Sequence, residues 1–454
     1  MSNFHRLFYV LLSLAALGAV ALFYYPFLSD DALISLRYSM RLVSGDGLSW
    51  NDGYYVEGYS NLSWVLAVAG LHAVGMDPII AARLLGIVLC GATLATFLYV
   101  GLKRAPGHVA GPAFLVSAGL LHSVAIWAIG GLEQPLALAT LFFASYALIR
   151  WWEAEFASPY LWLAGSAFAM LVITRPDAPL FAALSVAIPL LSNQAIGKRC
   201  LDAARLLALP SLAFFGQLLF RLAYYDSLVP NTAHAKVAFS VIRAFLGFEY
   251  VAMGALTMAV PLGLIFAAAW THPRKMPPPF WVFLLMAVSW SGYLVLMGGD
   301  IFPGYRHFMP LIALLWAIAL IAVSTPFVES LEQFAVRMGW SAKVGAVGLV
   351  ALLVAVQFLF PENYRAKLQR WEWSCKNIAQ DLRAEFESKD PLLAVTAAGC
   401  LPYWTEFETV DLLGLNDREL PKRKPEGFGR GYVGHELGDL DYLLERAPDI
   451  VVFH

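Results

Sequence analysis

The chain of 454 residues is 59% hydrophobic and only 14% charged, with a mean hydropathy of +0.64, which excludes an ordinary water-soluble protein. Its formal net charge of −2 argues against a nucleic-acid partner. The charge is unevenly placed, because 29 of the 64 Asp, Glu, Lys and Arg residues lie in the last 94 residues. The composition therefore predicts two domains, a polytopic membrane domain over residues 1–360 and a soluble domain over residues 361–454.

The first apolar segment, residues 7–28, is long enough to cross a bilayer. His5 and Arg6 precede it, which favours a cytoplasmic N-terminus. The residues around its end, FYYPFLSDD (23–31), lack the small side chains of a signal-peptide cleavage site, so we expect an uncleaved anchor. Residues 29–61 then form a loop on the far side of the membrane.

This loop opens with SDDALISLRYSMRL, in which Asp30 and Asp31 begin an amphipathic helix that also carries Arg37. Paired carboxylates can act as acid and base, and arginine can bind a phosphate. A plain interfacial helix would look similar, since Ser29 is a good N-cap and acids stabilise a helix N-terminus. The segment by itself leaves both interpretations open.

Ten further apolar segments follow, while residues 62–76 are shorter and are expected to lie at the membrane interface. The ten lie near 79–102, 109–131, 134–150, 158–173, 178–193, 206–225, 245–270, 279–297, 308–325 and 341–360. With eleven spans, the connecting loops that carry basic clusters all lie on the cytoplasmic side, as the positive-inside rule requires. These clusters are Lys103–Arg104, Arg150, Lys198–Arg199–Arg205, Arg274–Lys275 and Arg337–Lys343.

The same topology places four polar, Gly- and Pro-rich motifs beside the loop of Asp30 and Asp31. They are GGLE (130–133), TRPDAP (174–179), YYDSLVPNTAHAK (224–236) and GGDIFPGYRHFMP (298–310). Charged residues at span ends are costly in a membrane and are usually paired or functional. Each also has a simpler interpretation, such as Arg175 reaching the headgroups or Asp177 capping a helix. Their shared placement favours a single site on this face.

Residues 361–454 mix helical and strand-like patterns, which predicts a small α/β domain. Cys375 and Cys400 could form a disulfide if this domain is extracytoplasmic, and the four cysteines lack metal-ligand spacing. No nucleotide-binding glycine pattern occurs, which argues against a sugar-nucleotide donor or an ATP-driven pump. The helical pattern covers 364–388 and part of 434–449, and the strand-like runs lie in 391–404, 409–417 and 447–453.

The run DDALISLRYSMRLVSGDGLSWN…VEGYSN resembles the DDAFI..RYA.NL..G.GL.WN…VEGYTN signature of bacterial GT-C glycosyltransferases. More narrowly it resembles the arabinofuranosyltransferase group, which includes the mycobacterial cell-wall arabinan-capping enzyme and, closer in length, the Pseudomonas type IV pilin arabinosyltransferase. The match continues through GLE, TRPD, PNTAHAK, GGDIFPGYRHFMP and VDLLGLND. The resemblance implies a GT-C fold with about 11 transmembrane helices, amphipathic periplasmic loop helices and a small periplasmic α/β domain.

The resemblance also implies transfer of D-arabinofuranose from a polyprenyl-phosphoryl donor to a periplasmic hydroxyl, on pilin Ser/Thr or an arabinan terminus. It places the chain in a bacterial inner membrane, with its active site and C-terminus in the periplasm. The family's catalytic aspartate maps onto Asp30 or Asp31, and we expect Asp30 to be the base and Asp31 its partner. By motif position, the residues expected to bind the donor phosphate are Arg306, Arg175, Lys236, Arg37 and His307. Those expected to bind sugar or acceptor are Glu57, Tyr59, Asn61, Glu133, Asp177, Asn231, Asp300 and Tyr305.

No cofactor is firmly implied, although Asp30, Asp31 and Asp300 could together hold a divalent cation. One alternative function is transfer of another lipid-linked sugar, mannose or aminoarabinose, to protein or lipid A. A second is a lipid-linked sugar flippase or transporter, which would show repeat-like halves and polar residues deep within the spans. A third is a non-catalytic scaffold, which would tolerate loss of both aspartates.

Overall fold

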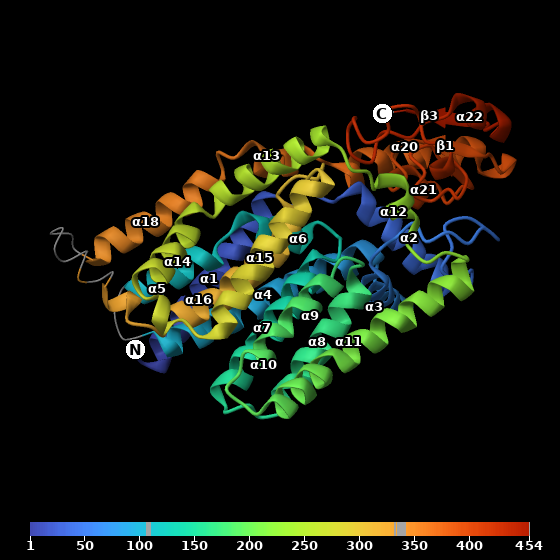
Figure 1. Cartoon of the computed structure of the whole chain (residues 1–454). Coiled ribbons are helices and arrows are strands. Elements are labelled where there is room, and N and C mark those ends of the chain that lie inside the picture. The colour runs from blue at the N-terminus through green and yellow to red at the C-terminus, as the bar shows by residue number, and fades with distance from the viewer. Residues whose placement is uncertain (106–109, 331–332, 334–341, 454) are drawn as a thin grey trace.

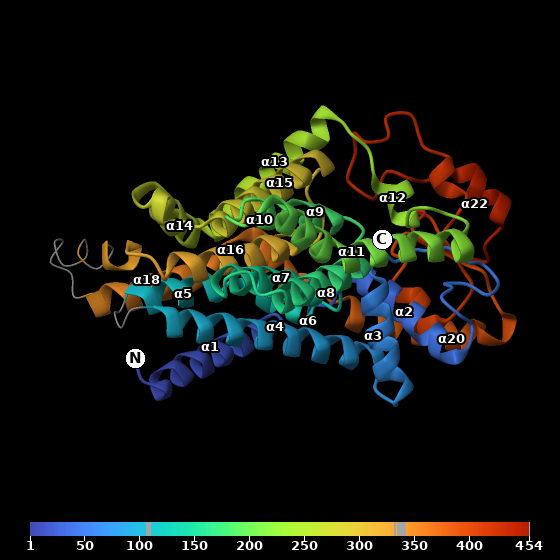
Figure 2. The ribbon, with the colours of Figure 1, turned by 60° about the horizontal axis from the view of Figure 1, so that its bottom comes forward.

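The computed structural model describes residues 1–105, 110–330, 333 and 342–453. The helices of the first 360 residues lie along one another as a bundle, and the C-terminal residues cover one end of this bundle (Figure 1). The N-terminus lies at the opposite end, as a second view also shows (Figure 2). We call residues 361–454 the tail.

Six helical segments of the described residues are long and apolar enough to cross a membrane. They are α1 (Asn3–Phe23), α4 (Pro78–Arg104), α5 (Ala110–Gly119) with α6 (His122–Ile129), α7 (Gln134–Glu153), α11 (Ile196–Tyr225) and α15 (Pro278–Met297). The pair α13 (Val241–Thr257) and α14 (Ala259–Thr271) adds a seventh if it is one span. These two helices meet at 84°, because Pro261 cannot donate to the carbonyl of Thr257 and its ring crowds that turn.

Shorter helices complete the bundle and its polar end. In the bundle lie α3 (Leu62–Ala73), α8 (Pro159–Thr174), α9 (Pro179–Ser185), α10 (Ala187–Leu190), α16 (Met309–Ala322) and α18 (Ala342–Gln357). The connections contain α2 (Asp30–Ser44), α12 (Asn231–Lys236), η1 (Pro273–Lys275) and η2 (Arg306–Phe308). Each of the eleven expected segments contains a helix, but several of these helices are shorter than a bilayer crossing. The sequence therefore predicted helix positions better than helix lengths.

Basic residues meet at the end of the bundle away from the tail. Arg104 closes α4 and Arg150 lies in the last turn of α7, and both guanidinium groups contact the carboxylate of Glu153, at 2.7 and 3.1 Å. Of the other expected basic positions, Arg337 and the side chain of Lys343 lie outside the described residues.

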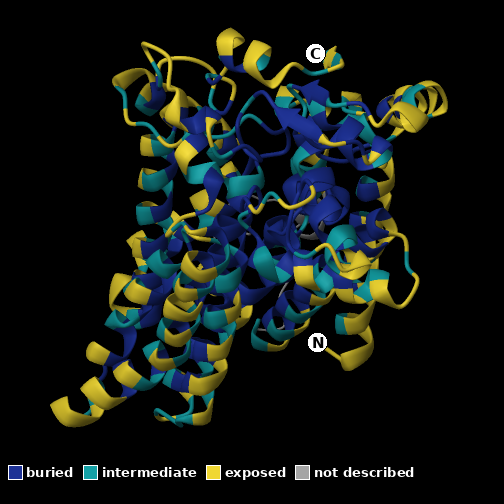
Figure 3. Cartoon of the chain, turned by 90° about the vertical axis from the view of Figure 1, so that its right-hand side faces the viewer, coloured by how far each residue is buried: buried dark blue, intermediate teal, exposed yellow. Residues whose placement is uncertain are grey.

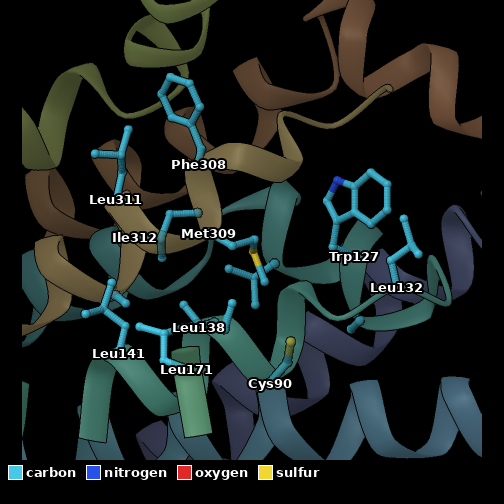
Figure 4. Packing of buried hydrophobic residues seen from close by; sticks show 14 of the residues in the cluster. Cys90, Trp127, Leu132, Leu138, Leu141, Leu171, Phe308, Met309, Leu311 and Ile312 are labelled. Atoms are coloured by element: carbon cyan, nitrogen blue, oxygen red, sulfur yellow. The ribbon is translucent and has the colours of Figure 1, made fainter. Parts of the chain in front are cut away.

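The core of the bundle surrounds α16, in which every residue is buried. A helix that is apolar on all sides is stable only when other elements enclose it. The Trp316 ring stacks on Phe97 of α4 at 5.0 Å between ring centroids, and its Nε1 donates to the carbonyl of Ala118 at 2.7 Å. Figure 4 shows the start of α16 packed beside Leu138 and Leu141 of α7.

Many residues on the outer faces of the bundle are exposed (Figure 3), and a number of them are large and apolar. Leu212 and Leu219 of α11 and Trp270 of α14 are about 70% exposed, although they are large and apolar. Such surfaces are costly in water and suit lipid. The chain is a multi-pass membrane protein.

The tail contains a three-stranded parallel sheet in the order β2-β1-β3. Leu393 at the start of β1 pairs with Thr409 on one side and Ile450 on the other. A disulfide joins Cys375 of α20 to Cys400 of α21, with Cα atoms 5.9 Å apart. The elements are α19 (Pro361–Leu368), α20 (Trp371–Phe386), η3 (Glu387–Lys389), β1 (Leu393–Val395), α21 (Cys400–Thr405), β2 (Thr409–Asp411), η4 (Leu420–Lys422), α22 (Leu440–Arg446) and β3 (Ile450–Val452).

Candidate active site

Asp30 is the first residue of α2, and the tail holds its carboxylate. The carboxylate accepts hydrogen bonds from the backbone N–H of Gly399 at 3.0 Å and of Cys400 at 2.9 Å. Burial, together with repulsion from Asp31, raises the pKa of Asp30 to about 7. The contact is so close that a Cβ on residue 399 would lie 1.9 Å from the Asp30 carbonyl oxygen, so only glycine fits there.

Asp31 follows on α2 and faces a cavity instead. Its side chain is 21% exposed, and its Oδ2 lies 3.5 Å from Nζ of Lys236 on α12, whose side chain is 23% exposed. At this distance the two charges attract each other, yet both remain within reach of a bound molecule. Asp31 thus carries the more exposed carboxylate of the pair.

We call the hollow in front of Asp31 the central cavity; its volume is about 440 Å³. Its walls come from α2, α12, the segment before α7, the end of α8 and the connection between α15 and α16. Ten of the predicted site residues line it: Asp31, Tyr59, Asn61, Glu133, Arg175, Asp177, Lys236, Asp300, Arg306 and His307. Motifs spread over more than 270 residues of sequence therefore meet at one place.

Arg175 is held between two carboxylates on one wall of the central cavity. Its Nε and Nη2 donate to the two oxygens of Asp177 at 2.9 and 2.7 Å, and its Nη1 donates to Glu133 at 2.8 Å. Asn61 donates to the other oxygen of Glu133 at 3.0 Å. Two carboxylates flank one guanidinium group here, so Arg175 has more carboxylate partners than the other cations that line the cavity.

Arg306 forms a two-pronged pair with Asp300 in the same cavity. Its Nε and Nη2 donate to the Asp300 oxygens at 2.7 and 2.9 Å. His307 follows, and burial together with the charges of Arg175, Arg306 and Lys236 lowers its pKa well below the usual value, so its ring is neutral at physiological pH. A neutral imidazole can donate one hydrogen bond and accept another.

The charges of the central cavity nearly balance. Four carboxylates, those of Asp31, Glu133, Asp177 and Asp300, face the three cations Arg175, Lys236 and Arg306. Among the residues that the structure describes, no three His, Cys, Asp or Glu side chains are arranged to hold a metal ion. Asp30, Asp31 and Asp300 therefore do not form the expected three-aspartate cation site among these residues.

Besides Asp30, four predicted residues lie outside the central cavity. Arg37 is buried against the tail, where it donates to the carbonyls of Trp50, Pro402 and Phe407. Glu57 is buried in an ion pair with Arg221 at 2.7 Å. Asn231 donates to three tail carbonyls, those of Gly414, Leu415 and Asp417. Tyr305 packs in the core against Tyr250 and Phe308.

These placements correct the expected roles of the four residues. Arg37 and Asn231 fasten the tail to the rest of the chain, because all the partners of the Asn231 amide and two of the three of Arg37 are tail carbonyls. Tyr305 has φ of 50°, and this left-handed turn directs its ring inward rather than toward the central cavity. None of the four is a lining residue of the central cavity.

Sequence reasoning missed several residues of the site. Tyr293 lines the central cavity from α15, and Trp290 one turn earlier donates from Nε1 to the carbonyl of His307 at 2.8 Å. Tyr225 bonds the hydroxyl of Tyr59 at 3.0 Å. All three lie within apolar or aromatic runs, where an aromatic residue is usually a core or interface residue, so their positions gave no distinct signal.

Comparison with known proteins gives one domain match and two sequence relatives. Residues 362–454 match a domain of unknown function, DUF8728. The chain is 27% identical over 342 residues to the terminal beta-(1->2)-arabinofuranosyltransferase of Mycobacterium tuberculosis, covering 66% of this chain and 53% of that protein. It is 24% identical over 436 residues to the Corynebacterium glutamicum protein of the same name, covering 86% and 59%. The chain thus spans little more than half the length of these curated relatives.

Among solved structures, the chain resembles ArnT from Cupriavidus metallidurans. The TM-score is 0.59 to the form bound to undecaprenyl phosphate, at 12% identity and with 90% of this chain and 86% of that chain covered. For the apo form the TM-score is 0.57, at 13% identity, with 88% and 85% covered. These likenesses confirm the expected fold, an α-helical polytopic GT-C membrane fold with a small C-terminal α/β part. The sequence matches confirm the resemblance to arabinofuranosyltransferases.

Proposed function

We propose that the chain is a membrane glycosyltransferase that moves D-arabinofuranose from a polyprenyl-phosphoryl donor to an acceptor hydroxyl. The observation that carries this proposal is the position of Asp31, a partly exposed carboxylate facing the cations Lys236 and Arg306 across one cavity. The relatives are named arabinofuranosyltransferases, and a protein of the same fold binds undecaprenyl phosphate. Both facts support a lipid-linked pentose donor.

Asp31 is the general base of this proposal, in place of Asp30. The acceptor oxygen attacks C1 of the arabinofuranose, the bond between C1 and the phosphate oxygen breaks, and the hydroxyl proton passes to the Asp31 carboxylate. Asp30 cannot serve as readily, because both its oxygens are occupied by the N–H groups of Gly399 and Cys400. Asp30 instead fixes the start of α2 and thereby the direction of Asp31.

Lys236 and Arg306 stabilise the phosphate that leaves. The phosphate gains negative charge as the bond to C1 breaks, and nearby cations lower the energy of that state. Lys236 makes a 3.5 Å contact with Asp31, and Arg306 is paired on one side through Nε and Nη2. Arg175, with two carboxylate partners, positions Glu133 and Asp177 for the sugar hydroxyls. Neutral His307 supplies a further hydrogen bond.

The isoprenoid chain of the donor lies in an apolar groove between α9 and α15, which we call the membrane groove. Its volume is about 730 Å³, and it shares Asp177 and Tyr293 with the central cavity. Its remaining lining is Leu180, Ser289, Gly292, Val295 and Leu296. A hydrocarbon chain in this groove would place its phosphate end at the cavity wall where Asp177 and Tyr293 lie.

The wider assignments follow from the same proposal. We propose that residues 1–360 are the catalytic membrane domain and residues 361–454 a soluble domain on the periplasmic face of a bacterial inner membrane. The N-terminus then lies in the cytoplasm. Ser or Thr of type IV pilin and the terminus of an arabinan both present suitable hydroxyl groups.

A transfer assay with purified full-length protein tests the proposal. Synthetic polyprenyl-phosphoryl arabinofuranose is mixed with peptide and arabinan-oligosaccharide acceptors, and mass spectrometry detects an added pentose. Wild type should transfer and Asp31→Asn should not. If neither transfer nor donor hydrolysis occurs, while mannosyl- or aminoarabinosyl-phosphoryl lipids are consumed, the sugar assignment is wrong. If no lipid-linked sugar is consumed at all, the enzyme assignment is wrong.

A further inference from the structure

A second cavity lies on the other side of Asp31 and Lys236. It has a volume of about 140 Å³, and it shares with the central cavity the residues Asp31, Ile34, Lys236, Ile301 and Leu415. Its outer wall belongs to the tail and includes Trp371, Ala397, Ala398, Tyr432 and His435. We call it the tail cavity. Asp31 therefore lines both hollows, whereas Asp30 lines the tail cavity alone.

The tail cavity continues outward into an open groove on the tail, the tail groove, with a volume of about 720 Å³. The two share Trp371, Thr396, Leu413 and His435. Adjoining residues thus line a route from the tail surface, past His435, to Asp31. The membrane groove instead adjoins the central cavity at Asp177 and Tyr293.

The lining of the tail groove is mainly aliphatic. It includes the side chains of Leu412, Leu413, Leu437, Leu440, Leu443 and Phe453. Leu440 is 69% exposed and Phe453 is 67% exposed, although burial of such side chains is favourable. Asp439, a charged residue of the lining, is already engaged, since its carboxylate caps α22 through the N–H of Tyr442 at 2.9 Å and lies 3.7 Å from Arg423.

This chemistry distinguishes between the two classes of acceptor. A glycan presents many hydroxyl groups and needs polar partners along its length, because unpaired polar groups are costly to bury. A peptide can place apolar side chains along an aliphatic groove. The tail cavity, at about 140 Å³, is smaller than the ~300–1,000 Å³ of sites for larger ligands and suits a single short side chain.

We propose that the acceptor is an extended polypeptide that lies along the tail groove and extends one Ser or Thr side chain through the tail cavity to Asp31. This inference rests on the proposed transferase function. The new bond joins Oγ of the acceptor to C1 of the pentose, the bond from C1 to the phosphate oxygen breaks, and the Oγ proton passes to Asp31. The polyprenyl phosphate leaves on the opposite side, through the central cavity.

Two leucines on α22 give a matched test. Leu440 lines the tail groove, whereas Leu444, one turn later and 67% exposed, is not among its lining residues. We compare Leu440→Asp with Leu444→Asp, using three acceptors: a peptide with apolar residues around a Thr, a blocked single Thr, and an arabinan oligosaccharide. Phe453→Ser provides a second groove variant if Leu440→Asp is poorly produced.

Leu440→Asp should raise the KM for the long peptide about tenfold or more, and leave transfer to the blocked Thr and the KM for the donor unchanged. Leu444→Asp should match wild type with every acceptor. Equal kinetics of Leu440→Asp, Phe453→Ser and wild type on the long peptide would overturn the inference. So would a wild type that glycosylates the oligosaccharide but neither peptide, and the transferase function would then still stand. A wild type that consumes no donor would instead contradict the function itself.

Discussion

Asp30 and Asp31 are neighbours on α2, yet their carboxylates enter different surroundings. Asp30 is buried against the backbone of Gly399 and Cys400, whereas Asp31 faces Lys236 between two cavities. Successive helix residues point about 100° apart. One aspartate can therefore anchor the helix while the other serves the reaction, and substitutions at the two positions should have different consequences.

Asp31→Asn should reduce kcat by about 10²–10⁴, the usual contribution of a general base. The amide keeps the size of the side chain but cannot accept the proton. Pentose transfer measured by mass spectrometry, at saturating donor, reports the loss, and the unfolding temperature should stay close to that of wild type. Asp30→Asn should keep more activity than Asp31→Asn, and the reverse order would assign the base to Asp30.

Arg306→Lys should lower kcat/KM for the donor by about 10–100-fold, because lysine cannot reproduce the planar two-pronged pair with Asp300. Arg150→Lys is the matched control, since Arg150 lies at the other end of the bundle beside Glu153. Donor kinetics at fixed acceptor concentration give both values. An equal effect of the two substitutions would show that Arg306 acts through stability alone.

Gly292→Trp should block the membrane groove without disturbing the fold, because no atom lies within 4 Å of a Cβ built at Gly292. Transfer from a long polyprenyl donor should fall at least tenfold, while transfer from a donor with a two-isoprene chain should change little. The ratio of kcat/KM for the two donors is the measurement. A similar change with both donors would place the isoprenoid chain elsewhere.

The stability of the chain should depend on pH through Asp30. Its pKa rises from 3.8 to about 7 on folding, so between these values the folded chain binds more protons than the unfolded chain. The free energy of unfolding contributed by this group therefore decreases as pH rises through that window, by at most a few kcal/mol, since one pKa unit is ~1.4 kcal/mol. The unfolding temperatures of detergent-solubilised wild type and Asp30→Asn, measured between pH 4 and 8, should depend differently on pH. The same pH dependence for both proteins would contradict the shifted pKa.

Arg37→Ala should loosen the tail. The substitution leaves the buried carbonyls of Trp50, Pro402 and Phe407 without their donor, at a cost of about 3 kcal/mol. Limited proteolysis should then cut within residues 361–454 faster than in wild type. Arg383→Ala is the control, because Arg383 lies on the tail surface, 38% exposed, where ion pairs with Glu387 and Glu406 contribute ~0–1 kcal/mol. Equal cleavage rates for the two variants would show that Arg37 does not anchor the tail.

Much of the site could be predicted from the sequence, because its motifs lie at helix ends on one side of the bundle. Arg175 follows α8, Lys236 ends α12 and Arg306 precedes α16. Once the direction in which each helix crosses the membrane is known, these three residues fall on the same face. The small α/β tail was also predicted, from strand-like runs such as 447–453 that the structure forms as β3.

The features that the sequence did not predict depend on contacts between residues far apart in the chain. Arg37 looked like a phosphate ligand because α2 is amphipathic, and no local pattern shows that Pro402 and Phe407 fold over it. The choice between Asp30 and Asp31 likewise depends on the position of Gly399. Helix lengths were overestimated where Pro261 bends the chain, because apolar composition continues across the break.

The bond between Asp30 and Gly399 joins residues 369 positions apart, and this separation affects how the protein is made. At synthesis rates of about 5–20 residues per second, α2 emerges roughly 20–70 s before its partner. During that interval the nascent chain has inserted its first helices, but neither Asp30 nor Arg37 has its tail partners. The site around Asp31 is therefore completed only after the ribosome has passed the codon for residue 400. A chain that stalls before this point leaves a bundle in the membrane in which Asp30 and Arg37 lack their tail partners.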